Sequence, residues 1–330
     1  MRRRNNLSIA FFLALILSIP FSSFAQDDLM DLLNDTEPAK QEKVIATFKT
    51  TRIIQAHTTE TVKANTMDVR ITHRFGNIYS TRNDNDGPDS FFGLDNIADV
   101  RLAVEYGITD ELMIGLGRSS RSNLIDGFAK YRFYQQTTDN KRPFSLALFT
   151  NIGIRAQKEG AFYSGVKPEL VAEYSSTKTF FHKISYTAQL IIARKFSPGL
   201  SIELLPTYIH RNFVNNPNDE NSTFALGVGG RVKVSKRVAI IADFFYVFSP
   251  FRYNNTTNPF YMPISIGVEI ETGGHVFHLE FTNAQGVVSN NFLVDSPHSW
   301  EFAEFKLGFN ISRVFNVGRR LKKAKEKVEG

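Results

Sequence analysis

The sequence predicts an all-β protein, an antiparallel up-and-down transmembrane β-barrel of about 12 strands, with about 14 as the alternative. Three observations carry this prediction. Segments of about ten residues alternate apolar and polar side chains, turn residues separate these segments regularly, and short connections alternate with longer ones. Beyond residue 25, no apolar run approaches the roughly 18 residues expected of a transmembrane helix.

The alternation is clearest in the last segment, 304–315. The odd positions from 305 to 311 hold Phe, Leu, Phe and Ile, whereas the even positions from 304 to 312 hold Glu, Lys, Gly, Asn and Ser. Segments 100–109 and 184–192 repeat the pattern. Because successive side chains of a strand point to opposite faces, each segment has one apolar and one polar face. We expect the apolar faces to contact lipid and the polar faces to line the lumen.

The connections between these segments also fit a membrane barrel. Short turns are expected at 109–111, 198–199, 235–237 and 273–274, with a slightly longer one at 139–141, and longer connections near 77–98, 118–124, 156–182, 213–222, 250–262 and 285–299. Membrane barrels have short periplasmic turns and longer outer loops. A soluble β-sandwich is the alternative fold, but its connections need not sort into a short and a long end.

The N-terminus has the pattern of an export signal. Three arginines at 2–4 precede an apolar run at 7–19, and Ser23-Phe24-Ala25 supplies small residues for cleavage after Ala25. A transmembrane anchor is the alternative, but a core of about 13 residues is too short to span a bilayer. The expected location is the cell outer membrane, and the expected partners are outer-membrane lipid and the barrel-assembly machinery.

Charge and cysteine content narrow the function classes. Loss of residues 1–25 removes three arginines and no acid, so the formal net charge falls from +6 to +3, and nucleic acid is not an expected partner. The chain has no cysteine, which excludes disulfides, a lipid-anchored cysteine and thiolate metal sites.

The predicted division of the mature chain has three parts. Residues 26–65 form a periplasmic N-terminal segment, and the strand-like stretch 48–62 within it is either a plug in the lumen or an extra strand. Residues 66–315 form the barrel, and 316–330 form a basic periplasmic tail.

Charged residues of both signs fall on the predicted polar faces. Ion pairs that fill a narrow barrel are the favoured interpretation, and a selectivity ring around an open channel is the alternative. The predicted lumen-facing charges are Arg70, Arg74, Arg101, Glu105, Arg231, Lys233, Asp243, Glu269, Glu271, Glu304 and Lys306.

Catalytic and metal motifs give little support to an enzyme. The patterns Gly-x-Ser-x-Gly and His-Glu-x-x-His do not occur, and His275 and His278 would face opposite sides of a strand. The chain is therefore expected not to be an enzyme, and no cofactor is expected apart from a candidate calcium site. Its ligands would be Asp84, Asp86 and Asp89 around Gly87, although an ordinary acidic loop is favoured.

Several strings in the mature chain resemble an uncharacterised family of bacterial outer-membrane β-barrel proteins. The resemblance covers nearly the whole mature chain and implies the barrel fold and the location, but no substrate and no catalytic residue. The strings lie at 73–76 (HRFG), 91–96 (FFGLDN), 192–196 (IARKF), 206–212 (PTYIHRN), 269–277 (EIETGGHVF) and 309–313 (FNISR).

Three functions remain as hypotheses. The first is a pore or binding barrel for a small polar solute, with the inward charges setting its preference. The second is a closed structural or interaction barrel that engages a partner through its loops or termini. The third, less favoured, is a lipid-modifying outer-membrane enzyme.

Overall fold

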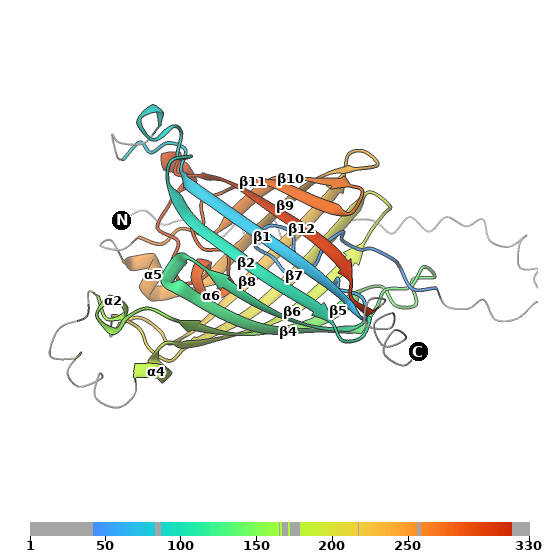
Figure 1. Ribbon diagram of the computed structural model, residues 1–330, viewed down its shortest axis with the longest axis horizontal. Coiled ribbons are helices and arrows are strands. Elements are labelled where there is room, and N and C mark those ends of the chain that lie inside the picture. Colours follow the sequence, from blue (N-terminus) through green and yellow to red (C-terminus); the bar gives the residue numbers. More distant parts are fainter. Residues whose placement is uncertain are drawn as a thin grey trace, which may run out of the picture. The chain divides into compact units, whose positions relative to one another are not determined.

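The computed structural model describes residues 42–82, 87–164, 166, 171, 179–216, 218–255 and 259–318. Twelve antiparallel strands form a closed barrel in which every strand pairs with its neighbours in the sequence (Figure 1). The ring closes where β1 pairs with β12, in a register that runs from Thr66 opposite Asn316 to Arg74 opposite Gly308. The predicted up-and-down barrel of about 12 strands is confirmed.

The strands are 8 to 12 residues long. Their bounds are β1 Thr66–Asn77, β2 Ile97–Gly107, β3 Leu112–Ser119, β4 Leu124–Tyr134, β5 Ser145–Arg155, β6 Ile184–Lys195, β7 Leu200–Arg211, β8 Ser222–Lys233, β9 Val238–Phe248, β10 Ile264–Thr272, β11 His275–Thr282 and β12 Lys306–Asn316. Short helices lie in the connections: η1 Pro88–Ser90, η2 Arg121–Asn123, α2 Glu159–Phe162, α4 Thr179–His182, α5 Pro250–Asn254, α6 Ser289–Phe292 and η3 Trp300–Phe302. Among the described residues, no helix has the length and apolar character needed to cross a bilayer.

The two ends of the barrel differ in their connections. At one end, here the short-turn end, the strands are joined through 108–111, 135–144, 196–199, 234–237 and 273–274. The opposite end, the long-loop end, carries 78–96, 120–123, 156–183, 212–221, 249–263 and 283–305. β1 begins and β12 ends at the short-turn end (Figure 1).

Two connections differ in length from the sequence prediction. The connection expected near 118–124 has only four residues, because β3 continues to Ser119 and β4 begins at Leu124. The turn expected at 139–141 belongs to a ten-residue connection. This connection is longer because it also holds the N-terminal segment: Thr137 forms a β-bridge with Lys43, and the amide of Val44 donates to the carbonyl of Gln136.

In the barrel wall the apolar side chains are exposed and the charged side chains are buried, the reverse of a soluble protein. On β2, Leu102 is 58% exposed and Val104 43% exposed, whereas the alternating residues Arg101 and Glu105 are buried. Arg70, Arg74, Lys130 and Lys306 are also among the largest fully buried side chains. Lys and Arg are rarely buried in soluble proteins unless they are paired. An apolar outer surface around a charged interior is the arrangement that a bilayer requires.

Candidate functional site

The lumen contains a segment of the chain itself, residues 47–62, here called the plug. Positions 50–59 are all buried although most of them are polar. The chain forms a small hairpin there: Arg52 bridges His57, and the amide of Ile53 donates to the carbonyl of Ala56 over 2.8 Å. The plug does not form one of the twelve strands of the barrel. Its polar groups bond instead to side chains on the inner wall.

One carboxylate of the wall holds the tip of the plug. Oδ2 of Asp243, on β9, accepts three consecutive backbone amides, from Ile54 at 3.2 Å, Gln55 at 2.6 Å and Ala56 at 3.0 Å. Consecutive amides that converge in this way form an anion-binding concavity, and hydrogen bonds to an ionised acceptor are the stronger kind. Asp243 therefore acts as a latch for the plug.

A second polar cluster holds the opposite side of the hairpin. Thr51 donates to Glu105 on β2 at 2.6 Å and accepts from Arg70 on β1 at 2.9 Å. Lys130, on β4, donates to the carbonyls of Thr51 and Thr58 at 2.8 and 2.9 Å. Three wall charges thus find partners in the plug, so its presence compensates for part of the cost of burying them.

Apolar contacts fit the plug to the same wall. An ideal Cβ at Gly229, on β8, would lie 2.8 Å from Cδ1 of Ile53, so the glycine leaves the room that Ile53 occupies. The His57 ring stacks on Phe149 with 3.8 Å between centroids. Phe48 and Ile54 belong to a buried apolar cluster with residues of β6 and β9.

Burial lowers the pKa of the two basic groups of the hairpin. Desolvation, assisted by the nearby Arg101 and Arg70, lowers the pKa of Arg52 to about 9. Desolvation and the charge of Arg52 lower the pKa of His57 well below its ordinary value. His57 is therefore neutral at physiological pH. Its Nε2 lies 2.8 Å from Nη2 of Arg52, which suits a neutral ring that accepts a hydrogen bond.

A loop from the long-loop end enters the lumen from the other side. The inserted loop, residues 284–293, carries α6 and is almost entirely buried. Its Val287 amide donates to Asp99 on β2 at 3.2 Å, and Phe292 packs edge-on against Phe245 of β9 with 5.1 Å between centroids. Arg52 of the plug donates to the carbonyl of Val287 at 3.3 Å. The plug and the inserted loop therefore meet inside the barrel.

Ion pairs along the wall account for most of the predicted lumen charges. Arg101 makes a bidentate contact with Asp126, Arg74 lies 3.4 Å from Glu280, and Arg231 pairs with both Glu269 and Glu271. The predicted residues that are buried are Arg70, Arg74, Arg101, Glu105, Asp243, Glu269, Glu304 and Lys306. Arg231 and Glu271 are half-buried.

Two of the predicted positions differ from the expectation. Lys233 is exposed, because it is the last residue of β8 and lies at the short-turn end. Glu304 is buried but precedes β12, in a loop where it pairs with Arg82 and accepts from Ser80 at 3.0 Å. Glu304 thus organises the connections at the long-loop end, and its pKa is lowered by the hydrogen bond from Arg82 against the opposing effect of burial.

The candidate calcium loop is only partly described. Asp84 and Asp86 lie outside the described residues, and Asp89 is exposed on η1. Among the residues that the structure does describe, no group of three or more His, Asp or Glu side chains is arranged to hold a metal ion. The predicted signal region, residues 1–25, and most of the predicted basic tail also lie outside the described part.

Sequence reasoning missed several charged groups inside the barrel, notably Lys130, which bonds to the plug, Asp126, which pairs with Arg101, and Arg52 of the plug itself. On β4 the inner face reads Leu124, Asp126, Phe128 and Lys130, and the alternation is unclear because apolar residues lie on both faces. Phe128 faces inward to contact the plug, with its ring centroid 5.6 Å from that of His57. A strand with charges and aromatics on one face and apolar residues on the other could have indicated that something packs inside the barrel.

The fold and its inverted burial define the class: the protein is an outer-membrane β-barrel, and its apolar outer surface is consistent with contact with membrane lipid. The chain belongs to the membrane-bound β-barrel domain family DUF5777, whose model matches residues 48–315. The match includes the plug as well as the strands. No curated protein sequence matches the chain significantly.

Solved structures of porins and of another outer membrane protein are similar to the barrel at low sequence identity. The NanC porin has a TM-score of 0.43 at 8% identity, over 75% of this chain and 98% of its own. The KdgM porin in complex with disordered oligogalacturonate also has a TM-score of 0.43, at 10% identity, over 76% of this chain and 99% of its own. The outer membrane protein Omp33 of Acinetobacter baumannii has a TM-score of 0.38 at 7% identity, over 76% and 98%.

Proposed function

We propose that the protein is a plugged outer-membrane barrel for small polar solutes, and that solute passes only when the plug leaves its seat. The observation that carries the proposal is the latch, in which one wall carboxylate holds three backbone amides of the plug tip. In this proposal the chain catalyses no reaction, and the long-loop end faces the outside of the cell.

The lining behind the plug supports a passage for polar solutes. Release of the plug would expose Arg70, Glu105, Lys130 and Asp243, which are buried when it is in place. A wall with charges of both signs is compatible with water and with small polar solutes. Buried ion pairs contribute little net stability compared with apolar groups of similar size. A barrel that stayed filled permanently would therefore be as stable with apolar side chains in place of these charges.

The test is single-channel recording in a planar bilayer on an Asp243→Ala chain. Loss of the latch leaves three buried amides without an acceptor, so we expect discrete conductance steps. The matched control adds Ile53→Cys and Gly229→Cys, at positions where a Gly229 Cβ would lie 2.8 Å from Cδ1 of Ile53, to a chain that has no cysteine of its own. The oxidised control should be silent, and reductant should restore the steps.

The proposal is contradicted if the Asp243→Ala barrel is folded but silent. It is also contradicted if the oxidised control, in which the disulfide between positions 53 and 229 is closed, conducts as well as the Asp243→Ala barrel does. A heat-dependent shift in gel mobility establishes that each variant is folded. Folded silence would favour a closed interaction barrel. The observation in favour of that alternative is the inserted loop, which is tied to the wall by Asp99 and by Asn290, whose amide donates to Ser185 at 2.8 Å.

A further inference from the structure

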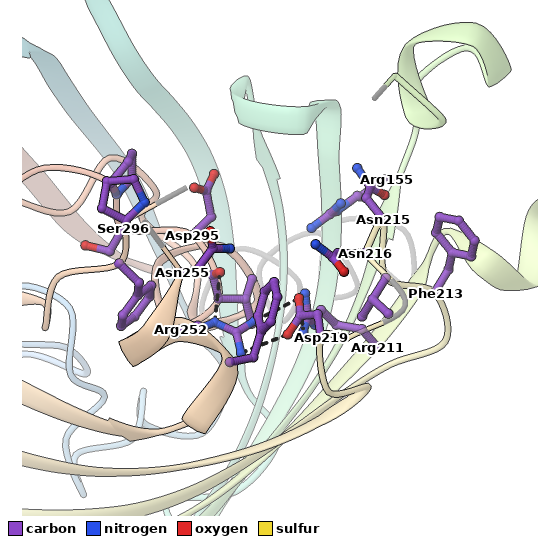
Figure 2. A pocket seen from close by; sticks show the side chains of 16 residues that line it. Arg155, Arg211, Phe213, Asn215, Asn216, Asp219, Arg252, Asn255, Asp295 and Ser296 are labelled. Atoms are coloured by element: carbon purple, nitrogen blue, oxygen red, sulfur yellow. Dashed lines mark hydrogen bonds and ion pairs between the residues drawn. The ribbon is translucent and has the colours of Figure 1, made fainter. Parts of the chain in front are cut away.

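A second charged region lies at the long-loop end, where the plug does not reach. A cavity of about 460 Å³, here the outer cavity, lies among the ends of β5 and β7, the loop with α5, and residues 294–297 (Figure 2). Its charged lining residues are Arg155, Arg211, Arg252, Asp219 and Asp295. Cavities of this size hold small molecules.

Two of the three arginines are held by one pair of acidic residues, Asp219 and Glu220, here called the acidic pair. Arg211 lies 3.0 Å from Asp219 and donates to the carbonyl of Glu220 at 2.6 Å. Arg252 lies 3.1 Å from the other oxygen of Asp219 and 3.4 Å from the Glu220 carboxylate. Figure 2 shows both guanidinium groups directed at Asp219. This acidic pair thus balances the two cations and holds them in fixed positions.

The third arginine is left with a surplus charge. Among the described residues, the Arg155 guanidinium makes no hydrogen bond or ion pair, although the side chain is half-buried at the end of β5. The remaining acid of the cavity, Asp295, forms its ion pair with Arg121, and it attracts Arg155 without a hydrogen bond or an ion pair at contact distance. The cavity therefore offers one guanidinium group with free donors. Its planar arrangement of donors suits the two oxygens of a carboxylate or phosphate.

We propose that the outer cavity binds a small organic solute through a carboxylate or phosphate group, with Arg155 as the residue that recognises the anion. The other lining residues suit the rest of such a molecule. The amides of Asn215 and Asn216 can bond to hydroxyl groups, and Phe213, Phe251 and Phe260 supply apolar surface.

This inference deepens the proposed function by naming the class of solute, and it rests on that function for the claim that the bound molecule is cargo. Binding to the cavity does not require the plug to move. The experiment therefore measures binding to the intact mature chain, so that a failure of binding is distinguishable from a failure of conduction.

Isothermal titration of the detergent-solubilised mature chain compares three probes: gluconate, glucose 6-phosphate and neutral glucose. We expect gluconate or glucose 6-phosphate to bind at least about tenfold more tightly than glucose, because only the anions engage the free guanidinium. The stronger of the two anions identifies the oxyanion that the cavity prefers.

Substitutions locate the site. Arg155→Gln should weaken anion binding about tenfold or more, and Arg155→Lys should restore only part of it, because lysine keeps the charge but loses the paired donors. Arg118→Gln makes the same change at an exposed position on β3 and should have no effect. Asp295→Asn should tighten binding about two- to fivefold, a gain that misfolding cannot produce.

Two results would overturn the inference. One is equal binding of the anions and glucose, or no binding of any of the three. The other is that the Arg155→Gln variant binds the anions as tightly as the unsubstituted chain and the Arg118→Gln control do. The gel-mobility shift again verifies that each variant is folded.

Discussion

The plug seat and the outer cavity are both rich in charge, yet they differ in how their charges are satisfied. In the seat, Asp243 and Lys130 bond to the backbone of the plug itself. In the outer cavity, Arg211 and Arg252 share one acidic pair, whereas the Arg155 guanidinium makes no hydrogen bond or ion pair with the described residues and is attracted only by the charge of Asp295. The chain thus supplies its own ligand at one site and leaves a donor free at the other.

This difference indicates which part of the barrel is closed and which part is ready to bind. A buried charge without a partner is costly, so the seat is stable only with the plug in place. A charge that lines a cavity and is only partly buried, as at Arg155, costs less because water can reach it.

The largest effect is expected from breaking the latch. Asp243→Ala should lower the hydrogen-exchange protection of the amides of Ile54, Gln55 and Ala56 about a hundredfold or more, because three amides lose one charged acceptor. Exchange in the inserted loop should change little. The measurement is hydrogen exchange followed by mass spectrometry on the folded barrel.

Asp99→Ala is the matched control, because Asp99 accepts the Val287 amide of the inserted loop and does not contact the plug tip. It should loosen residues 284–293 and leave 54–56 protected. Equal loosening of both segments by both substitutions would show that the plug and the loop form one cooperative unit, which is contrary to the account.

A smaller effect is expected from pH. His57 is neutral in its seat because its pKa lies well below the ordinary value, whereas in a released plug it binds a proton below pH of about 6.5. Falling pH therefore favours release, and stability is retained above that range. Protection of residues 53–58, corrected for intrinsic exchange, should fall by at most about tenfold per pH unit from this residue.

The groups that disfavour protonation of His57 are Arg52 on the plug and Lys130, Arg101 and Arg70 on the wall. His57→Gln removes the titrating ring and should reduce the slope of protection against pH. An unchanged slope would assign the pH dependence to other groups.

The smallest effect is expected from salt, and it should distinguish the two regions. Raising the ionic strength from about 0.05 to about 0.5 M should weaken anion binding in the outer cavity several-fold, because its charges are accessible to counterions. Protection of the plug should change little, because the Arg70 and Glu105 side chains are buried. Equal sensitivity would mean that water and ions already reach the seat.

The strands were predictable because lipid and lumen impose a period of two, as on β2, where Leu102 and Val104 alternate with Arg101 and Glu105. The twelve-strand closure followed from counting such segments. The inward charges were identified for the same reason, with Lys233 as an exception because the strand ends there.

The contacts inside the barrel were not predictable, because they join residues that are distant in sequence. Asp243 lies almost 190 positions from the plug amides that it holds, and no local pattern connects them. The inserted loop was expected as an ordinary polar connection, but Phe292 and Leu293 are fully buried in the lumen. The lack of an ion pair at Arg155 was likewise not predictable, because it depends on which acidic residues pair with the other arginines in the folded chain.

The most direct test of a plugged lumen is single-channel conductance of the chain without the predicted signal region, residues 1–25, beside the same chain that also lacks residues 47–62. The heat-dependent gel shift verifies that both are folded. The account predicts silence or rare brief events from the intact chain and frequent, discrete steps from the deleted one. Steady conductance from the intact chain would contradict it. Silence from the folded deletion would also contradict it, because the lumen would then be closed without the plug.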